Sequence, residues 1–193
     1  MQLRDVLRQR RRAIAPQARF SAAHALADAL MDLPFLPEDG PVAGYWCGDG
    51  EISLHSWQLR LPSQLTYCLP ILVPGTRILR FAPWKPGDPL EINRYGIPQP
   101  TVSATEAYPA EEMALVAVPL VGFDDQGHRL GRGGGWYDAT FAFRGTQHPP
   151  PWLVGVGFAA QQVDHLRAQP WDVTLDAVCT ESATHVFRSE SGA

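Results

Sequence analysis

The sequence has no long hydrophobic run and no apolar stretch near its arginine-rich N-terminus. Its longest apolar runs, such as MALVAVPLVGF, fall well short of the roughly 20 residues that a membrane-spanning helix requires. The N-terminus also lacks the apolar core of a secretory signal peptide. These absences predict a cytoplasmic protein without a membrane partner.

Cysteine is scarce, and neither cysteine nor histidine is spaced as a disulfide framework or metal site requires. Cys47, Cys68 and Cys179 are an odd number at wide, irregular intervals, so we expect three buried thiols. No two of the six histidines stand at ligand spacing. We predict that His128 is a solvated loop residue, because no partner carboxylate can be identified for it. A G-x-S-x-G turn is also missing, which leaves a serine-hydrolase function without support.

The chain does have enough apolar material for one core. Its 193 residues are 45% hydrophobic and 19% charged, which predicts a single domain over residues 1–193. A net charge of −4 disfavours a general nucleic-acid binder. Residues 1–19 nevertheless hold six arginines and one aspartate, a formal +5 that leaves −9 for the remainder. We expect a monomer with small-molecule partners and no nucleic acid; weak RNA binding by the basic N-terminus is a salt-sensitive alternative.

The hydrophobic pattern predicts two N-terminal helices, followed by strands that alternate with turns or helices. A helix is predicted over residues 3–14, and a second one begins at Pro16. The apolar face of this second helix is predicted to comprise Phe20, Ala23, Ala27 and Leu30. Strand-like runs occupy residues 42–46, 66–73, 78–84, 113–120, 152–158 and 176–180, with further helices expected at 53–60 and 160–169. Because several runs lack polar alternation, the predicted fold class is α/β: a three-layer sandwich with a mainly parallel central sheet and helices on both faces.

A glycine-rich stretch, RLGRGGGWYD, follows the run at 113–120 and opens a helix-like segment. Ligands of open α/β sheets bind at the carboxyl ends of strands, where a bare backbone can approach a bulky anion. The predicted phosphate cradle comprises Arg129, Gly131, Arg132, Gly133, Gly134 and Gly135. A flexible glycine turn with solvated arginines is the alternative, because neither a P-loop nor G-x-G-x-x-G fits the stretch. Asp138 could hold a Mg²⁺ ion that bridges the phosphates, or it could be an ordinary first-turn helix charge.

A second glycine pattern occurs near the C-terminus. Gly155, Gly157 and Ala160 have the outline of a dinucleotide-binding fingerprint, with Asp176 about 20 residues further on. Only 36 residues follow Gly157, however, too few for a dinucleotide fold built forward from that strand. We instead expect both glycines to let a central strand pass close to the glycine loop or to a ligand.

The stretch FDDQGHRLGRGGGWYD closely resembles the signature of 5-formyltetrahydrofolate cyclo-ligases, approximately FD-x-x-G-x-RLG-x-G-x-GYYD. The resemblance covers nearly the whole chain: an LR-x-x-x-R opening helix, GYW followed by GEI, a W-x-PGD turn, GIPQP and a late LDAVCTE. It implies a Rossmann-like sheet of the type that sugar-phosphate isomerases and acyl-CoA transferases also use. A sugar-phosphate isomerase function, which would not require ATP, therefore remains an alternative.

The resemblance also implies an ATP- and Mg²⁺-dependent reaction. In that family ATP phosphorylates the formyl oxygen of 5-formyltetrahydrofolate, N10 attacks the resulting carbon, and phosphate leaves to give 5,10-methenyltetrahydrofolate and ADP. Positioning and charge neutralisation are what phosphoryl transfer mostly needs. The folate, which can carry a polyglutamate tail, needs aromatic walls and oriented polar groups.

Carried over position by position, the resemblance implies particular residue roles. Catalysis would involve Arg132, Trp136 and Tyr137. ATP would be bound by the opening helix, which closes over it, and by the glycine loop: Arg4, Arg8, Arg129, Gly131, Arg132, Gly133, Gly134, Gly135, Trp136 and Tyr137. The folate would contact Trp46 (or Tyr45), Glu51, Arg132, Gly133, Gly134, Gly135 and Trp136. Mg²⁺ would be held by Asp138 and Asp176. Without the resemblance, Glu51 would be interpreted as a surface residue and Asp176 as a turn aspartate. Arg4 and Arg8 would be interpreted as part of a solvated helix face.

Three positions depart from the family pattern. The lysine that many members carry just before the opening LR is missing, since only Met1 and Gln2 precede Leu3. Trp136 replaces the first tyrosine of GYYD, which exchanges a hydroxyl for an indole N–H that can only donate. Gly134 stands where some members have lysine. These departures leave open a folate- or nucleotide-binding paralogue without cyclo-ligase turnover.

Overall fold

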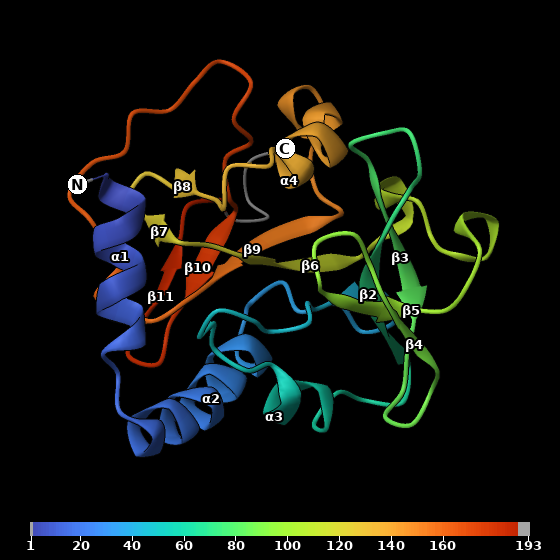
Figure 1. Ribbon diagram of the computed structural model, residues 1–193, viewed down its shortest axis with the longest axis horizontal. Coiled ribbons are helices and arrows are strands. Elements are labelled where there is room, and N and C mark those ends of the chain that lie inside the picture. Colours follow the sequence, from blue (N-terminus) through green and yellow to red (C-terminus); the bar gives the residue numbers. More distant parts are fainter. Residues whose placement is uncertain (1, 189–193) are drawn as a thin grey trace.

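The computed structural model describes residues 2–188 and contains a seven-stranded central sheet (Figure 1). The strand order is β11-β10-β9-β6-β1-β2-β3. These strands are β1 (Gly40–Ala43), β2 (Leu65–Leu72), β3 (Leu79–Pro83), β6 (Leu115–Pro119), β9 (Trp152–Val156), β10 (Ala177–Cys179) and β11 (Thr184–Val186). The five inner strands run parallel, whereas the edge strands β3 and β11 pair antiparallel with their neighbours. The predicted α/β class with a mainly parallel sheet is confirmed.

Shorter elements complete the fold. Two small antiparallel ribbons form from β4 (Leu90–Ile92) with β5 (Pro98–Pro100) and from β7 (Gly122–Phe123) with β8 (Arg129–Leu130). The α-helices are α1 (Leu3–Arg12), α2 (Pro16–Met31), α3 (His55–Gln58) and α4 (Trp136–Thr140). Short 3-10 helices occur at η1 (Ala104–Glu106), η2 (Ala110–Glu112), η3 (Ala142–Gly145) and η4 (Ala159–Gln161). Within residues 2–188 no helix combines the length and the apolar character needed to cross a membrane.

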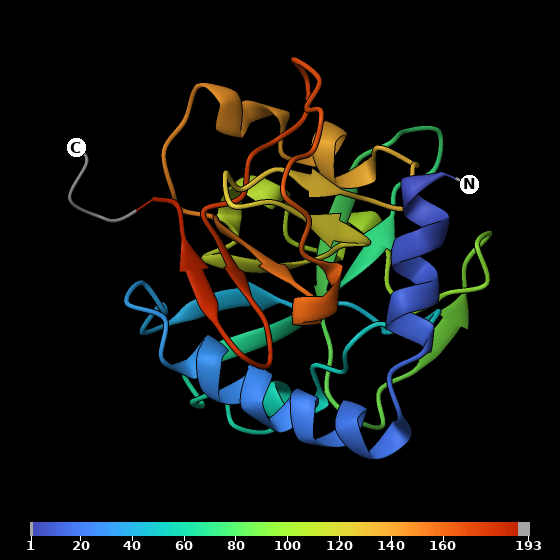
Figure 2. The same cartoon turned by 90° about the vertical axis from the view of Figure 1, so that its left-hand side faces the viewer.

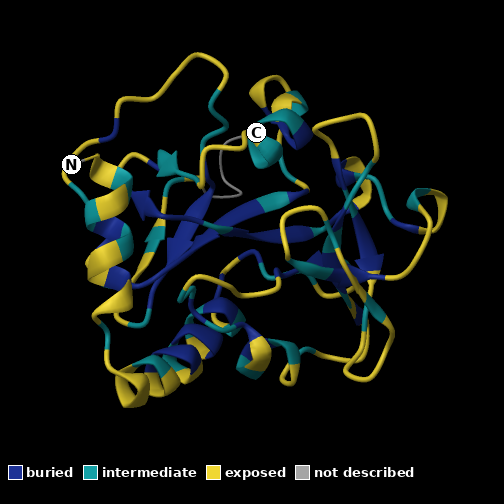
Figure 3. Cartoon of the chain, in the orientation of Figure 1, coloured by how far each residue is buried: buried dark blue, intermediate teal, exposed yellow. Residues whose placement is uncertain are grey.

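Helices cover both faces of the sheet. Helices α2 and α3 lie on one face, and α4 with η3 lies on the other (Figures 1 and 2). Strand β6 contributes to both layers: Leu115 and Ala117 pack in the cluster of α2 and α3, while Val116 and Val118 pack with Phe141 beyond α4. The inner strands β6, β9 and β10 are accordingly buried on both sides, which explains the missing polar alternation (Figure 3).

The helix predicted over residues 160–169 is wrong. Only η4 forms at its start, and the chain then runs without regular structure. Val163 donates its backbone N–H to the Phe123 carbonyl, and Leu166 donates its own to the Asp124 carboxylate. Because the β7 segment takes these donors, they are not available to a helical ladder.

Three side chains differ from their predicted environment. Phe20 is 69% exposed, whereas Ala23, Ala27 and Leu30 do form the buried face of α2. Cys47 is exposed, while burial raises the pKa of both Cys68 and Cys179 to about 12. The arginines of α1 are not uniformly solvated, because Arg11 is completely buried.

Gly155 in β9 and Gly157 just after it lie against leucine side chains. A Cβ atom added to Gly155 would lie 2.5 Å from Leu175 Cδ1 and 2.9 Å from Leu120 Cδ2. At Gly157 it would lie 2.7 Å from Leu120 Cδ1. The glycines therefore admit these leucines against the sheet, and the atoms nearest to them do not belong to the glycine loop.

Candidate active site

A cavity of about 610 Å³ lies beyond the carboxyl ends of β1 and β6. Most of the residues singled out from the sequence line it: Arg4, Trp46, Glu51, Arg129, Gly131, Arg132, Gly133, Gly134, Gly135, Trp136, Tyr137 and Asp138. Segments far apart in the chain thus line one cavity, as expected at this edge of a parallel sheet. Arg8 and Asp176 are not part of the cavity lining.

The glycine loop connects β8 to α4 and depends on its glycines for conformation. Gly133 has φ +100° and Gly135, which precedes the first turn of α4, has φ +66°. Side chains are disfavoured in this left-handed region. A Cβ atom at either position would meet nothing within 4 Å, so backbone conformation, and not crowding, requires glycine there.

Gly134 has a different constraint, which involves the neighbouring tryptophan. A Cβ atom added there would lie 2.8 Å from Trp136 Cδ1 and 3.2 Å from Nε1. A side chain at this position therefore requires the indole to move. The two departures from the family pattern, Gly134 and Trp136, are compatible with each other for this reason.

Arg129 and Asp138 brace the cavity wall. Arg129 Nη2 donates to Asp138 Oδ1 at 2.7 Å, and its Nη1 donates to the Val173 carbonyl at 2.7 Å. The Val173 N–H donates to the same Asp138 oxygen at 3.1 Å. Because the guanidinium is 6% exposed and bonded twice, Arg129 holds β8, α4 and the 173 segment together. Asp138 has one carboxylate oxygen committed to this brace.

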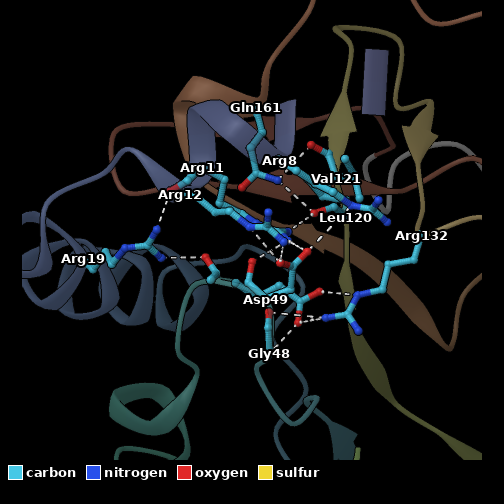
Figure 4. Close-up of polar contacts among 12 residues, drawn as sticks. Arg8, Arg11, Arg12, Arg19, Gly48, Asp49, Leu120, Val121, Arg132 and Gln161 are labelled. Atoms are coloured by element: carbon cyan, nitrogen blue, oxygen red, sulfur yellow. Dashed lines mark hydrogen bonds and ion pairs between the residues drawn. The ribbon is translucent and has the colours of Figure 1, made fainter. Parts of the chain in front are cut away.

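Arg132 joins the glycine loop to the turn that follows β1. Its Nη2 lies 2.7 Å from Glu51 Oε2, and its Nε donates to Oε1 at 3.1 Å. Its Nη2 also donates to the Gly48 carbonyl at 3.3 Å, and Figure 4 shows the side chain reaching that turn. The Glu51 side chain is only 5% exposed, so it is a cavity carboxylate and not a surface residue.

Helix α1 lies beside this turn and reaches the glycine loop. Arg4 donates from Nε to the Gly131 carbonyl at 3.0 Å. Arg11 and Arg12 reach the Asp49 carboxylate, and Arg8 Nε lies 3.7 Å from it (Figure 4). Leu7 is completely buried and fills the space over Gly122, where a Cβ atom would lie 2.5 Å from its Cδ1.

Aromatic side chains form another wall of the cavity. Tyr95 meets Trp136 edge to face with ring centroids 6.0 Å apart, and Trp46 meets Trp84 in the same way at 5.8 Å. Burial, and then the Glu51 charge, raise the pKa of Tyr137 well above its ordinary value. Its hydroxyl is therefore neutral near pH 7 and available as a hydrogen-bond donor. Sequence reasoning missed Tyr95; its signal was an aromatic residue in a proline- and glycine-rich excursion between strands.

Asp176 lies in the core, away from the cavity. It is completely buried and accepts hydrogen bonds from Arg144 Nη2 at 2.8 and 2.9 Å and from the Leu153 N–H at 2.8 Å. The structure therefore does not bring Asp176 together with Asp138. Within residues 2–188 no three His, Cys, Asp or Glu side chains are grouped closely enough to hold a metal ion. The residues present do not fit a protein-built Mg²⁺ site.

His128 also differs from its predicted environment. It lines the cavity, and its Nδ1 lies 3.0 Å from Asp124 Oδ2, so the expectation that it has no carboxylate partner is wrong. Burial alone would raise the pKa of Asp124, but hydrogen bonds from Leu166, His128 and Gln126 outweigh this effect and lower it. Asp124 thereby holds His128 and the segment at Leu166 against the cavity.

The sequence matches the model of the 5-formyltetrahydrofolate cyclo-ligase family over residues 1–181. The chain belongs to this family. It is 33% identical over 180 residues to the 5-formyltetrahydrofolate cyclo-ligase of Escherichia coli, a match that covers 92% of this chain and 97% of the relative. It is 32% identical over 177 residues to the 5-formyltetrahydrofolate cyclo-ligase of Haemophilus influenzae, covering 90% and 93%.

Solved structures confirm the cyclo-ligase fold. The 5,10-methenyltetrahydrofolate synthetase of Aquifex aeolicus superposes with a TM-score of 0.80 at 24% identity and covers 99% of this chain and 94% of its own. The synthetase of Mycoplasma pneumoniae gives a TM-score of 0.68 at 22% identity, covering 93% and 96%. The family resemblance and the fold class inferred from the sequence are both confirmed.

The cyclo-ligase loop offers a direct test of the link between Gly134 and Trp136. We expect Gly134→Lys to lower kcat/KM because the new side chain must displace the indole, and Trp136→Tyr to preserve folding and maintain or raise turnover. In the double variant the loss should be largely recovered, with a coupling of about 0.5–3 kcal/mol in a double-mutant cycle. Gly145→Lys, which adds the same charge at an open position, is the control. Strictly additive effects would show that the two positions do not interact.

Proposed function

We propose that this protein converts 5-formyltetrahydrofolate to 5,10-methenyltetrahydrofolate with ATP as co-substrate, releasing ADP and phosphate. The family membership supports the reaction class. The observation that carries the proposal for the site is that the signature loop, from Arg129 to Asp138, lines one cavity together with Glu51 and Trp46. The domain is proposed to be the whole chain, residues 1–193, with α1 closing over the nucleotide.

The proposed reaction proceeds in two steps, a phosphorylation and a cyclisation. The formyl oxygen attacks the γ-phosphorus of ATP, forming a P–O bond as the bond to ADP breaks. N10 then attacks the formyl carbon and loses its proton, and the C–O bond breaks as phosphate departs with the former formyl oxygen. The enzyme has to neutralise charge and hold the reacting atoms close.

The cavity residues are suited to both needs. Arg132 and Arg4 supply positive charge on either side of the glycine loop, where preorganised donors stabilise charge that develops on phosphate. Gly133 and Gly135 keep the backbone free of side chains, so that amides can approach the phosphates. Glu51 and Tyr137 provide a carboxylate and a neutral hydroxyl for the pterin, and Trp136 provides a flat face.

We treat Mg²⁺ as part of the nucleotide substrate. ATP phosphates carry the ion with them, and Mg²⁺ usually retains several waters when it binds through one carboxylate and substrate phosphates. Asp138 is the carboxylate of the predicted pair that lines the cavity, and its Oδ2, which does not take part in the brace with Arg129, would be available to such an ion. No step of the proposal depends on a Mg²⁺ ion held by the protein alone.

Arg94 is proposed to receive the negatively charged tail of the folate. Its guanidinium carbon lies 5.2 Å from the ring centroid of Tyr95 and 5.4 Å from that of Trp136, and no carboxylate among residues 2–188 forms an ion pair with it. Stacking on two rings orients a guanidinium while leaving its N–H edge free for carboxylates. A tail of several glutamates would offer it more than one carboxylate.

We therefore expect Arg94→Gln to raise the KM for a triglutamyl substrate by about ten-fold and that for the monoglutamate by less, with kcat nearly unchanged. Initial rates with both substrates measure this difference. Arg77→Gln, which removes an exposed charge from the turn before β3, is the control. Equal effects of Arg94→Gln on both substrates would contradict a role in tail binding.

We further propose that the enzyme works as a monomer in the cytoplasm, where ATP and reduced folates are both present.

The fate of the formyl oxygen tests the proposed chemistry. With substrate labelled by ¹⁸O in the formyl group, the released inorganic phosphate should carry the label, as mass spectrometry can measure. Unlabelled phosphate accompanying methenyl product would mean that ATP activates some other group.

A further inference from the structure

A single aspartate in the turn after β1 gathers three arginines of α1. Arg11 Nη2 donates to the Asp49 carboxylate at 2.9 Å and to its backbone carbonyl at 2.7 Å. Arg12 Nε donates to Asp49 Oδ1 at 3.0 Å. Arg8 Nε lies 3.7 Å from Oδ2, the oxygen that Arg11 contacts. Figure 4 shows Arg11 and Arg12 reaching Asp49 from the helix, with Arg8 beside them. Asp49 does not line the cavity, so none of the roles described for the cavity residues applies to it.

The contact with Arg11 joins a buried cation to a partly exposed carboxylate. Arg11 is completely buried, and its Nη1 donates to the Leu120 carbonyl at 3.4 Å. Burial lowers the pKa of Arg11, while the charges of Glu51 and Asp49 oppose that shift. Burial alone would raise the pKa of Asp49, but Arg12, Arg11 and Arg8 outweigh it and lower the value. Asp49 thus supplies the carboxylate bonded to a cation that water does not reach.

The backbone of the turn directs Asp49 and Glu51 to opposite partners. Asp49 has φ +50°, and within the described residues it is the one non-glycine residue with positive φ. The Glu51 N–H donates to the Gly48 carbonyl at 3.0 Å, and the Gly48 N–H donates to Glu51 Oε2 at 3.0 Å. The turn is therefore closed on itself, with Asp49 paired to α1 and Glu51 paired to Arg132 of the glycine loop.

Helix α1 has little else to hold it in place. Leu7 is its one fully buried apolar residue and Val6 is half-buried, so polar contacts carry much of its docking. Arg19 of α2 supports the same turn by donating to the Gly50 carbonyl at 2.7 Å and to the Arg11 carbonyl. The N-terminal end of α1 brings Leu3 and Arg4 to the cavity. Docking of this end consequently depends on the ion pairs made one and two turns further along.

We propose that Asp49 is a positioning residue of the cyclo-ligase reaction: it couples the docking of α1 to the placement of Glu51 and Arg132. This inference rests on the proposed function. Removal of the carboxylate frees α1, withdraws Arg4 from the glycine loop and loosens the turn that holds Glu51. Asp49 acts through these residues and does not touch the substrates itself.

The test uses variants that keep the turn's backbone conformation. Asp49→Asn removes the charge but retains the shape, and asparagine tolerates positive φ. Asp49→Gly removes the side chain where glycine is favoured. Both should raise the KM for ATP by about ten-fold with a smaller change in kcat, and ligand-free protein should be cut by trypsin after the α1 arginines about ten times faster. Asp28→Asn, which breaks the exposed pair with Arg60, should leave both quantities unchanged.

The possible outcomes separate coupling from ordinary stabilisation. An unchanged KM for ATP together with an unchanged trypsin rate overturns the proposal, even where the melting temperature falls. Should the single variants fail to fold, Arg11→Met combined with Asp49→Asn removes the buried cation with its partner, and a wild-type KM in that variant would overturn the proposal equally. If wild-type protein forms no methenyl product, the proposed function fails, whereas trypsin cleavage without nucleotide still decides whether Asp49 holds α1.

Discussion

Replacement of Arg132 by glutamine is expected to lower kcat about 100- to 1,000-fold while the protein stays folded. The guanidinium is the cation of the glycine loop, it lines the cavity, and it is fixed by two contacts to Glu51. Loss of a preorganised donor at the site of developing charge typically costs this much in kcat. Steady-state rates at saturating ATP and folate measure the effect.

Two comparisons make the Arg132 result specific. Arg132→Lys should recover little activity, because an ammonium group cannot reproduce the paired contacts of the guanidinium with Glu51. Arg60→Gln removes an arginine from an exposed ion pair and should leave kcat within about two-fold of wild type. A kcat for Arg132→Gln near that of Arg60→Gln would remove Arg132 from the catalytic machinery.

Asp176→Asn is expected to destabilise the protein by about 3–5 kcal/mol without a specific effect on Mg²⁺ dependence. Its carboxylate is completely buried against Arg144, which is 2% exposed, and the substitution leaves that cation without its charged partner. For a chain of this length the melting temperature should fall by about 10 °C. Thermal unfolding followed by circular dichroism measures the shift.

The Asp176 experiment also separates a structural from a metal-binding role. Arg144→Met combined with Asp176→Asn should recover part of the lost stability, because no buried charge then remains. Asp28→Asn, at an exposed pair, should change the melting temperature little. A normal melting temperature together with a raised Mg²⁺ requirement would instead place Asp176 in the metal site that the family pattern implies.

The sheet could be predicted because its strands are buried on both faces. Runs such as residues 113–120 contain apolar residues at successive positions, and β6 indeed packs Leu115 and Val116 into different layers. The segment 160–169 has a helical composition, but Asp124 and the Phe123 carbonyl bind its backbone donors. That competition comes from residues about 40 positions earlier, which local periodicity does not contain.

The candidate site was predictable where its residues are contiguous. The glycine loop appeared as a pattern, and the cavity contains all of its glycines. The ion pairs between Arg11 and Asp49 and between Arg132 and Glu51 join residues 38 and 81 positions apart. Their partners are selected by the packing of α1 and the turn after β1, so neither pairing could be read from the sequence. The Mg²⁺ role of Asp176 came from the family resemblance alone, since its burial against Arg144 is likewise a tertiary property that the sequence does not show.

The ATP-dependent cyclisation is proposed to take place in this cavity. The most direct measurement follows the absorbance of methenyltetrahydrofolate while full-length protein is mixed with 5-formyltetrahydrofolate, Mg²⁺ and ATP, beside a control without ATP. The methenyl band should grow only when ATP is present. Folded protein that produces no methenyl band with ATP would contradict it, and would identify the chain as a member of the family that binds folate or nucleotide without turnover.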